Sequence, residues 1–227
     1  MDYSGVISSV KGSIAAVIDF DENQQITGHG TGFLYQRSDI IVTCNHVVDS
    51  DKPLVWFREV DEKPVPAEVV LRNIEHDIAI LKIASSDKIP IKPYAGEVQV
   101  GMPVIFPGYP FEWTSLTAHQ GIISGVTIDD SGTKNYSIDG SVNGGNSGGP
   151  LLSNKGELIG VVNASRRVNM EVIEQVRGMT ENHLAVGGID ITKILQMLTR
   201  NLQLGIGYAV PLSLIHISEP TRLRRIS

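Results

Sequence analysis

The chain has 227 residues, of which 41% are hydrophobic and 19% are charged, and its formal net charge is −6. This size and apolar content suffice for one sizeable core or two small lobes. The acidic balance argues against nucleic acid as a partner, and no apolar run approaches the roughly 20 residues that a membrane-spanning helix needs.

Cofactor and compartment are constrained by what the sequence lacks. Cys44 is the only cysteine, so no intramolecular disulfide can form. No Cys/His cluster has the spacing of a zinc site, and the metalloprotease motif His-Glu-x-x-His is absent. We therefore predict no metal and no other cofactor. The first residues carry neither a basic start nor a long apolar run, so no signal peptide is expected and the predicted compartment is the cytoplasm.

Short runs rich in Val and Ile, separated by Gly, Pro, Asn and Asp, recur at the spacing typical of β-barrels. The first group of expected strands is Ser13–Phe20, Gly30–Tyr35, Asp39–Thr43, Leu54–Phe57, Ala67–Arg72 and Ile78–Ala84. The second group is Pro103–Phe106, Leu116–Gly125, Asn135–Ile138, Pro150–Ser153, Leu158–Ala164 and Gly205–Val210. The sequence thus predicts an all-β fold of two six-stranded antiparallel barrels, residues 1–100 and 101–211, joined around Tyr94–Gly101.

Two segments late in the second barrel have the apolar spacing of helices. They are Val168–Met179 and Ile189–Asn201, the latter with Ile191, Ile194 and Leu195 on one face. They predict a helical insert over residues 166–204. A lid, a contact between copies in a homo-oligomer and an activation element are its candidate roles, and the sequence does not choose among them.

The end of the chain has an unusual composition. Residues Leu212–Arg222 are identical to the translation of a widely used transposase sequencing adapter. An eleven-residue identity is too long for chance, so Leu212–Ser227 is interpreted as a non-native scar and left out of the fold prediction. On this interpretation the natural chain is cut after about Pro211.

Three phrases suit a serine hydrolase, and their key residues occur in the order His46, Asp77, Ser147. A serine hydroxyl becomes a nucleophile at neutral pH when a neighbouring base takes its proton. His46 is the candidate base, and Asp77 is the candidate carboxylate that holds the imidazole in the productive tautomer. Taken alone, each phrase has a structural alternative. In chain order these are a structural histidine, a strand cap and an ordinary tight loop. Their joint occurrence in this order favours catalysis. The phrases are Ile41–Val48, His76–Lys82 and Gly145–Pro150.

The glycines around Ser147 suit a loop that approaches the substrate closely. The backbone N–H groups of Gly145 and Ser147 are the predicted oxyanion hole. The same phrase also matches Gly-x-Ser-x-Gly, the nucleophile elbow of α/β-hydrolases. That elbow must lead into a helix, whereas Pro150 and a strand-like pair of leucines follow here, so we reject it.

These phrases resemble the trypsin-like peptidase superfamily, and more closely its HtrA/Deg-type bacterial branch. The likeness covers about Ile14–Val162 and returns at Gly205–Pro211. It implies the chymotrypsin-like double barrel, with His46 and Asp77 on the first barrel and Ser147 on the second. Asn146 stands where digestive relatives carry an acidic residue that pairs with a new N-terminus, so activation by that ion pair is not expected.

The same resemblance implies two sets of substrate contacts. The strand Val161–Ser165 is expected to pair with the substrate backbone, which makes Val161, Val162, Asn163 and Ala164 predicted binding residues. The floor of the specificity pocket is expected at Ser141 and Val142, with Ile206 across from them. None of these is acidic, so we expect a small or medium aliphatic residue before the scissile bond rather than Arg or Lys.

The predicted function is therefore a serine endopeptidase acting on polypeptides. The resemblance implies unfolded or damaged proteins as substrates and a role in protein quality control. One alternative is a peptide-binding module that keeps the cleft but is held inactive by the insert. Another is an esterase-like or defence-associated effector whose activity is triggered by a partner.

Overall fold

A computed structural model describes residues 2–57, 63–110, 115–128, 132, 134–164, 185–186, 189–194 and 206–217. Residues 1–165 and 205–227 form one compact unit, and residues 166–204 form a second. The first unit begins with helix α1 (Ser4–Val10) and a 3₁₀ turn (Lys11–Ser13), neither of which the sequence analysis anticipated. Val10 is buried, and a Cβ at Gly156 would lie 3.4 Å from its Cγ1, so α1 packs on the turn between two strands of the second barrel.

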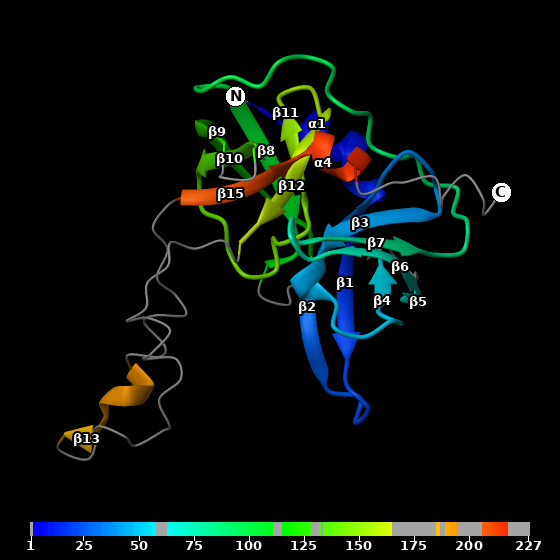
Figure 1. Ribbon diagram of the computed structural model, residues 1–227, viewed down its shortest axis with the longest axis vertical. Helices are drawn as coiled ribbons and strands as arrows, with labels where there is room; N and C mark the ends of the chain where they lie inside the picture. Colours follow the sequence, from blue (N-terminus) through cyan, green and yellow to red (C-terminus); the bar gives the residue numbers. More distant parts are fainter. Residues whose placement is uncertain are drawn as a thin grey trace. The chain divides into compact units, whose positions relative to one another are not determined.

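The N-terminal half forms one antiparallel sheet with the order β5-β4-β1-β2-β3-β7-β6 (Figure 1). The strands are β1 (Ile14–Phe20), β2 (Ile26–Leu34), β3 (Ile40–Cys44), β4 (Leu54–Trp56), β5 (Val65–Pro66), β6 (Glu68–Asn73) and β7 (Ile78–Lys82).

Six of the seven strands of this sheet overlap the six that the sequence predicts, and β5 falls on none of them. The two outermost strands, β5 and β6, are consecutive in the chain and are separated only by Ala67. Pro66 has no N–H for a ladder, and the Ala67 N–H donates to the carbonyl of Pro53 at 2.9 Å. One bent strand therefore pairs with β4 at its start and with β7 along its length, and the sheet curls back on itself.

The C-terminal half is a closed six-stranded barrel with the order β10-β15-β12-β11-β8-β9 (Figure 1). Its strands are β8 (Pro103–Gly108), β9 (Thr117–Ile128), β10 (Lys134–Asp139), β11 (Pro150–Ser153), β12 (Leu158–Asn163) and β15 (Ile206–Pro211). Each overlaps one predicted strand. The predicted all-β, chymotrypsin-like fold is confirmed.

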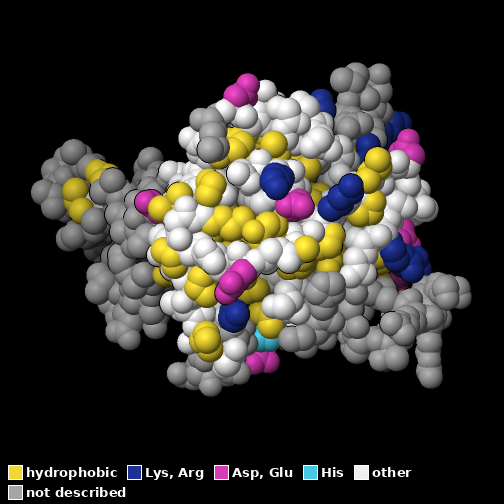
Figure 2. All heavy atoms as spheres, turned by 90° about the horizontal axis from the view of Figure 1, so that it is seen from above, with side chains coloured by type: hydrophobic (Ala, Val, Ile, Leu, Met, Phe, Trp, Pro, Cys, Tyr) yellow, Lys and Arg dark blue, Asp and Glu magenta, His cyan; other side chains and the backbone are white. Residues whose placement is uncertain are grey.

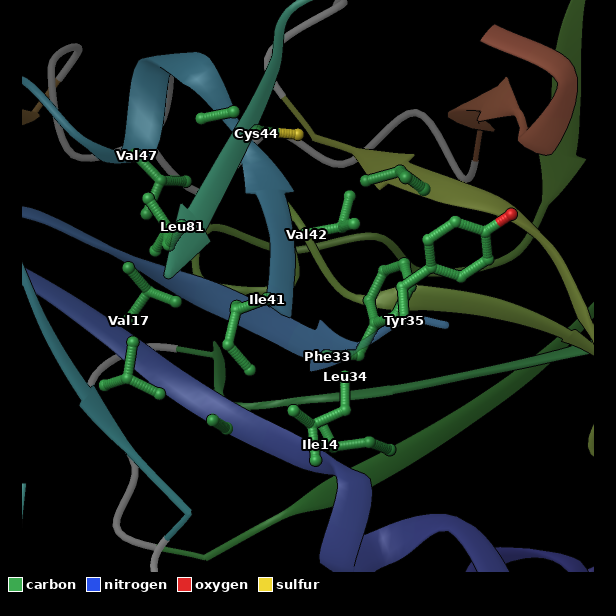
Figure 3. Packing of buried hydrophobic residues seen from close by; sticks show 14 of the residues in the cluster. Ile14, Val17, Phe33, Leu34, Tyr35, Ile41, Val42, Cys44, Val47 and Leu81 are labelled. Atoms are coloured by element: carbon green, nitrogen blue, oxygen red, sulfur yellow. The ribbon is translucent and has the colours of Figure 1, made fainter. Parts of the chain in front are cut away.

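Apolar side chains from both halves fill two cores. In the first, β1, β3 and β7 place Val17, Ile41 and Leu81 on one face of the sheet. Phe33 of β2 and Val42 of β3 lie on the other face, and none of the five has exposed surface (Figure 3). The second core lies inside the closed barrel and includes Phe106. Because burial of an apolar side chain contributes about 1.5–3 kcal/mol, these cores can hold the fold without a disulfide.

In the insert, the described residues form a two-stranded hairpin of β13 (Ala185–Val186) and β14 (Ile189–Asp190), followed by a helical turn at 191–194. The prediction of helix from Ile189 is therefore wrong for its first two residues. The Oδ1 atom of Asp190 accepts the Lys193 N–H at 3.1 Å, which is how an N-cap residue begins a helix. The other predicted helix, Val168–Met179, lies outside the described residues.

The first part of the tail, Leu212–Ile217, belongs to the fold. Helix α4 (Leu212–Ile217) follows β15, contacts β12, and has Leu214 only 6% exposed within the first core. Leaving these residues out of the fold was thus wrong, while their non-native origin stays a prediction.

No helix in the described ranges is long and apolar enough to span a membrane. Figure 2 shows hydrophobic side chains gathered in a band on one face, with charged side chains beside them.

Candidate active site

The antiparallel pairing of β3 and β7 brings His46 to Asp77. Cys44, the last residue of β3, pairs with Ile78, the first residue of β7, so the chain leaves one strand where it enters the other. His46 lies in a 3₁₀ turn (Asn45–Val47) directly after β3, and Asp77 directly precedes β7. The His46 Nδ1 atom is 2.6 Å from Asp77 Oδ2, and the His46 backbone N–H donates to Asp77 Oδ1 at 2.9 Å.

Asp77 is held as a hydrogen-bond acceptor on both oxygens. In addition to the two bonds from His46, the side-chain amide of Asn163 donates to Asp77 Oδ2 at 2.8 Å. The side chain of Asp77 is 18% exposed and that of His46 is 36% exposed, so the pair sits at the edge of the core with the imidazole toward solvent. Asp77 also has a φ of 55°, a left-handed conformation that is uncommon outside glycine. The three hydrogen bonds to its two oxygens thus fix the position of the carboxylate.

Ser147 lies in the loop that leads into β11 and is only 4% exposed. Its carbonyl accepts the Thr31 N–H from β2 at 2.8 Å. Gly148 has a φ of 82°, and a Cβ on it would overlap the carbonyl of Thr31 and the hydroxyl of Thr43. Only glycine fits this position, because the loop of the second barrel lies directly on the backbone of the first.

The end of β12 connects the serine to the carboxylate. Asn163 donates its side-chain amide to Asp77, and the next residue, Ala164, donates its backbone N–H to Ser147 Oγ at 3.1 Å. Asn163, the last residue of β12, and Ala164, which follows it, therefore hold the carboxylate of Asp77 and the hydroxyl of Ser147. The three residues that the sequence selected, although far apart in the chain, are gathered where the two halves of the first unit meet.

The loop before Ser147 presents backbone donors. Gly145 has a φ of 91°, and the N–H of Asn146 donates to the Asn143 carbonyl at 3.0 Å. Within the described residues, the N–H groups of Gly145 and Ser147 donate to no other residue. Buried backbone N–H groups are normally hydrogen-bonded. The N–H groups of Gly145 and Ser147, on either side of the bonded N–H of Asn146, therefore have the character of an anion-binding site.

Cys44 adds a third group beside the histidine and the aspartate. Its Sγ atom, a ring nitrogen of His46 and a carboxylate oxygen of Asp77 lie within 4.8 Å of one another, a donor set that could hold a metal ion. However, the Cys44 thiol donates to the Val162 carbonyl at 3.3 Å, and the other two groups bind each other. We interpret the cluster as a hydrogen-bonded network. The absence of a metal cofactor stays a prediction.

Comparisons with known proteins agree with this geometry. A family model described as the trypsin-like peptidase domain matches residues 30–161, which include all three residues. The chain belongs to the trypsin-like peptidase family. It is 37% identical over 163 residues to "Serine protease HtrA-like" of Staphylococcus haemolyticus, a match covering 64% of this chain and 25% of that protein.

Other relatives are of the same branch. The chain is 27% identical over 212 residues to "Serine protease Do-like HtrA" of Lactococcus lactis, which covers 87% of this chain and 50% of that one. The crystal structure of the serine endoprotease from Yersinia pestis has a TM-score of 0.69 at 23% identity, covering 96% of this chain and 65% of that chain. This trypsin-like domain thus spans a quarter to a half of the length of these two curated relatives.

The predicted substrate strand requires a correction. In this peptidase fold both residues are buried, Val161 in the first core and Val162 in the core of the closed barrel. Their backbones pair with β15, and Val161 also pairs with β11. They have no free edge for a substrate. The side chain of Asn163 binds Asp77, so Asn163 supports the carboxylate rather than contacting a substrate through that side chain. Ala164, which is half-buried and directly follows β12, is the predicted contact that remains near Ser147. Ser165 lies outside the described residues.

The predicted pocket residues are placed as follows. Ser141 is exposed, and the half-buried Val142 packs its methyl groups over the α-carbon of Gly207 in β15. Ile206, whose backbone pairs with Asp139, is adjacent to Gly207, and its side chain is not described. Val142 thus lies beside the residue that follows Ile206, and the assignment of a specificity pocket to these residues stays a prediction.

A neutral histidine supports the segment that leads to Ser141. Phe106 packs against Gly140 and stacks on His119, with ring centroids 5.5 Å apart and an interplanar angle of 14°. Burial lowers the pKa of His119 from its usual value of 6.5, so the ring is uncharged at neutral pH. An uncharged imidazole can be buried against an aromatic ring without the desolvation cost of a charge.

Two supporting residues were missed by sequence reasoning. Asn163 was assigned to the substrate, although a polar residue ending the apolar run Leu158–Val162 is a sign of a specific partner. Thr31 lies within the predicted strand Gly30–Tyr35, and no contact was predicted for it. The signal in the sequence is the pair of glycines that flank it, Gly30 and Gly32, because glycine allows another segment to approach the backbone closely. A Cβ at Gly30 would lie 2.8 Å from the Ser147 carbonyl.

Proposed function

We propose that this chain is a serine endopeptidase domain in which His46, Asp77 and Ser147 act as a catalytic triad. The observation that carries the proposal is the end of β12, where Asn163 holds the carboxylate and Ala164 holds the hydroxyl. Because Nδ1 of His46 faces Asp77, Nε2 is the nitrogen left to act as a base toward serine.

The proposed reaction has two halves. Ser147 Oγ attacks the carbonyl carbon of the scissile bond while its proton passes to His46 Nε2. The resulting oxyanion accepts the N–H groups of Gly145 and Ser147. The carbon–nitrogen bond then breaks, the leaving amine takes the proton from His46, and an acyl-enzyme remains. Water attacks this ester with His46 again as base, which releases the acid and restores the serine hydroxyl.

The proposed substrates are polypeptides that expose extended segments, as unfolded or damaged proteins do. This part of the proposal, and a role in protein quality control, is supported by the likeness to the HtrA branch alone. For the insert 166–204 we retain a lid, an oligomer contact and an activation element as candidate roles.

A fluorophosphonate probe tests the proposal directly. We expect the wild-type chain to be labelled at Ser147, because the probe requires a serine activated by its histidine. The Ser147→Ala variant should lose the label, whereas Ser124→Ala, which removes an exposed hydroxyl from β9, should keep it. Peptide mapping by mass spectrometry identifies the labelled residue. A folded wild-type chain that stays unlabelled would contradict the proposal and favour a peptide-binding module.

Profiling with a peptide library tests the specificity. Val142 and Ile206 are apolar, and Ser141 carries no charge, so a cationic residue at P1 would be desolvated without a partner. We expect cleavage after small and medium aliphatic residues to exceed cleavage after Arg or Lys by at least about tenfold in kcat/KM, as one pocket methylene changes it by about 10–200-fold. Strong selection for Arg or Lys would reject this pocket assignment.

A further inference from the structure

Thr31 of the first sheet makes side-chain and backbone contacts with the serine loop of the second barrel. It is in β2 and has no exposed surface. Its hydroxyl donates to the Gly145 carbonyl at 2.7 Å, and its backbone N–H donates to the Ser147 carbonyl at 2.8 Å. These are the residues whose N–H groups form the proposed oxyanion hole.

The direction of the hydroxyl bond is fixed by a second neighbour. The Tyr109 backbone N–H donates to Thr31 Oγ1 at 3.0 Å. A threonine hydroxyl has one proton and two lone pairs, so with Tyr109 as its donor it gives its own proton to Gly145. Tyr109 directly follows β8, and Thr31 therefore links the first sheet, the second barrel and the serine loop within a buried site.

Gly145 is the residue at which this loop can rotate. Its φ of 91° lies in the region that glycine enters freely, so the torsions alone do not hold the flanking peptides. The peptide that joins Gly145 to Asn146 is instead held at both ends. Thr31 binds its carbonyl, and the Asn143 carbonyl binds its N–H. Without the Thr31 hydroxyl, the Gly145 carbonyl would be an unpaired buried acceptor. Its free energy would then fall if the peptide rotated and the carbonyl bonded to another donor or to water.

We propose that Thr31 is a positioning residue that sets the oxyanion hole by holding the Gly145 carbonyl. This inference rests on the proposed serine endopeptidase function. Rotation of the Gly145–Asn146 peptide would displace the neighbouring donors from the developing oxyanion. Loss or misplacement of such a donor lowers kcat while leaving substrate binding largely intact.

The test compares Thr31→Val, Thr31→Ser and Thr43→Val in the full chain. Valine keeps the shape of threonine and removes the hydroxyl, whereas serine keeps the hydroxyl. Thr43 is the matched control, because it is also fully buried and its hydroxyl donates to the Thr31 carbonyl at 2.8 Å rather than to the serine loop. Loss of that bond should lower thermal stability much as Thr31→Val does.

For Thr31→Val we expect kcat for a peptide substrate to fall about 10²-fold with KM little changed. Thr31→Ser should recover most of the rate, and Thr43→Val should stay within about threefold of wild type at a similarly lowered melting temperature. Equal losses of kcat in both valine variants, or a wild-type rate in Thr31→Val, would overturn the inference. A wild-type chain that is inactive and unlabelled by fluorophosphonate would instead refute the proposed function.

Discussion

Replacement of Ser147 with alanine is expected to lower kcat for a peptide substrate by about 10⁶-fold, which corresponds to about 8 kcal/mol of transition-state stabilisation. The alanine leaves the loop backbone, including the bond from Thr31 N–H to the residue 147 carbonyl, in place. It removes the oxygen that Ala164 binds and that would form the acyl bond. KM should change little, because the hydroxyl serves to form the acyl bond rather than to bind the substrate in its ground state.

The measurement is steady-state hydrolysis of a fluorogenic peptide with an aliphatic P1 residue. Melting temperature shows whether the fold survives, and Ser124→Ala on β9 controls for loss of a serine hydroxyl elsewhere. A Ser147→Ala variant that retains a rate within about tenfold of wild type would mean that another group is the nucleophile. The buried Cys44 would then be the first to replace, because its sulfur lies near His46 and Asp77.

The strands were predictable because apolar and β-branched runs separated by turn residues depend on local sequence. Each strand of the closed barrel overlaps a predicted run, including β12, which is apolar on both faces because it is buried on both. The break at Ala67 was not predictable, since it depends on where Pro53 comes to lie. Helix α1 was missed because Ser4–Val10 is short and much of it is exposed, so it has little amphipathic pattern.

The three residues of the proposed triad could be selected from the sequence for a different reason. Each is marked by its own neighbours, and their order along the chain is characteristic of this superfamily. The supporting contacts have no such local mark. Asn163 is 86 residues from Asp77, and Thr31 is 114 residues from Gly145, so each pair exists only once the two halves have packed together. The error at Val161 and Val162 has another origin, because the ends of a strand predicted from sequence are uncertain by a few residues.

Replacement of Asp77 with asparagine is expected to lower kcat by about 10⁴-fold near neutral pH, while the fold is kept. The carboxylate accepts the His46 backbone N–H on Oδ1, and the His46 ring and the Asn163 amide on Oδ2. An asparagine has one oxygen for these three donors. If its NH₂ group faces the ring, Nδ1 must accept, the proton moves to Nε2, and His46 cannot take the serine proton. If its NH₂ group faces the His46 backbone N–H, two donors oppose each other and His46 is displaced.

Steady-state kinetics of Asp77→Asn and of Asp49→Asn separate this effect from a simple change in charge. Asp49 is exposed and close in sequence to His46, so its amide variant removes the same charge nearby and should keep the wild-type kcat. Asn163→Ala should give an intermediate loss of roughly tenfold, because it removes one donor from the carboxylate and leaves both bonds to His46. If Asp77→Asn retained kcat within about tenfold of wild type, Asp77 would have no role in setting the tautomer, and the hydrogen bond at 2.6 Å would be structural only.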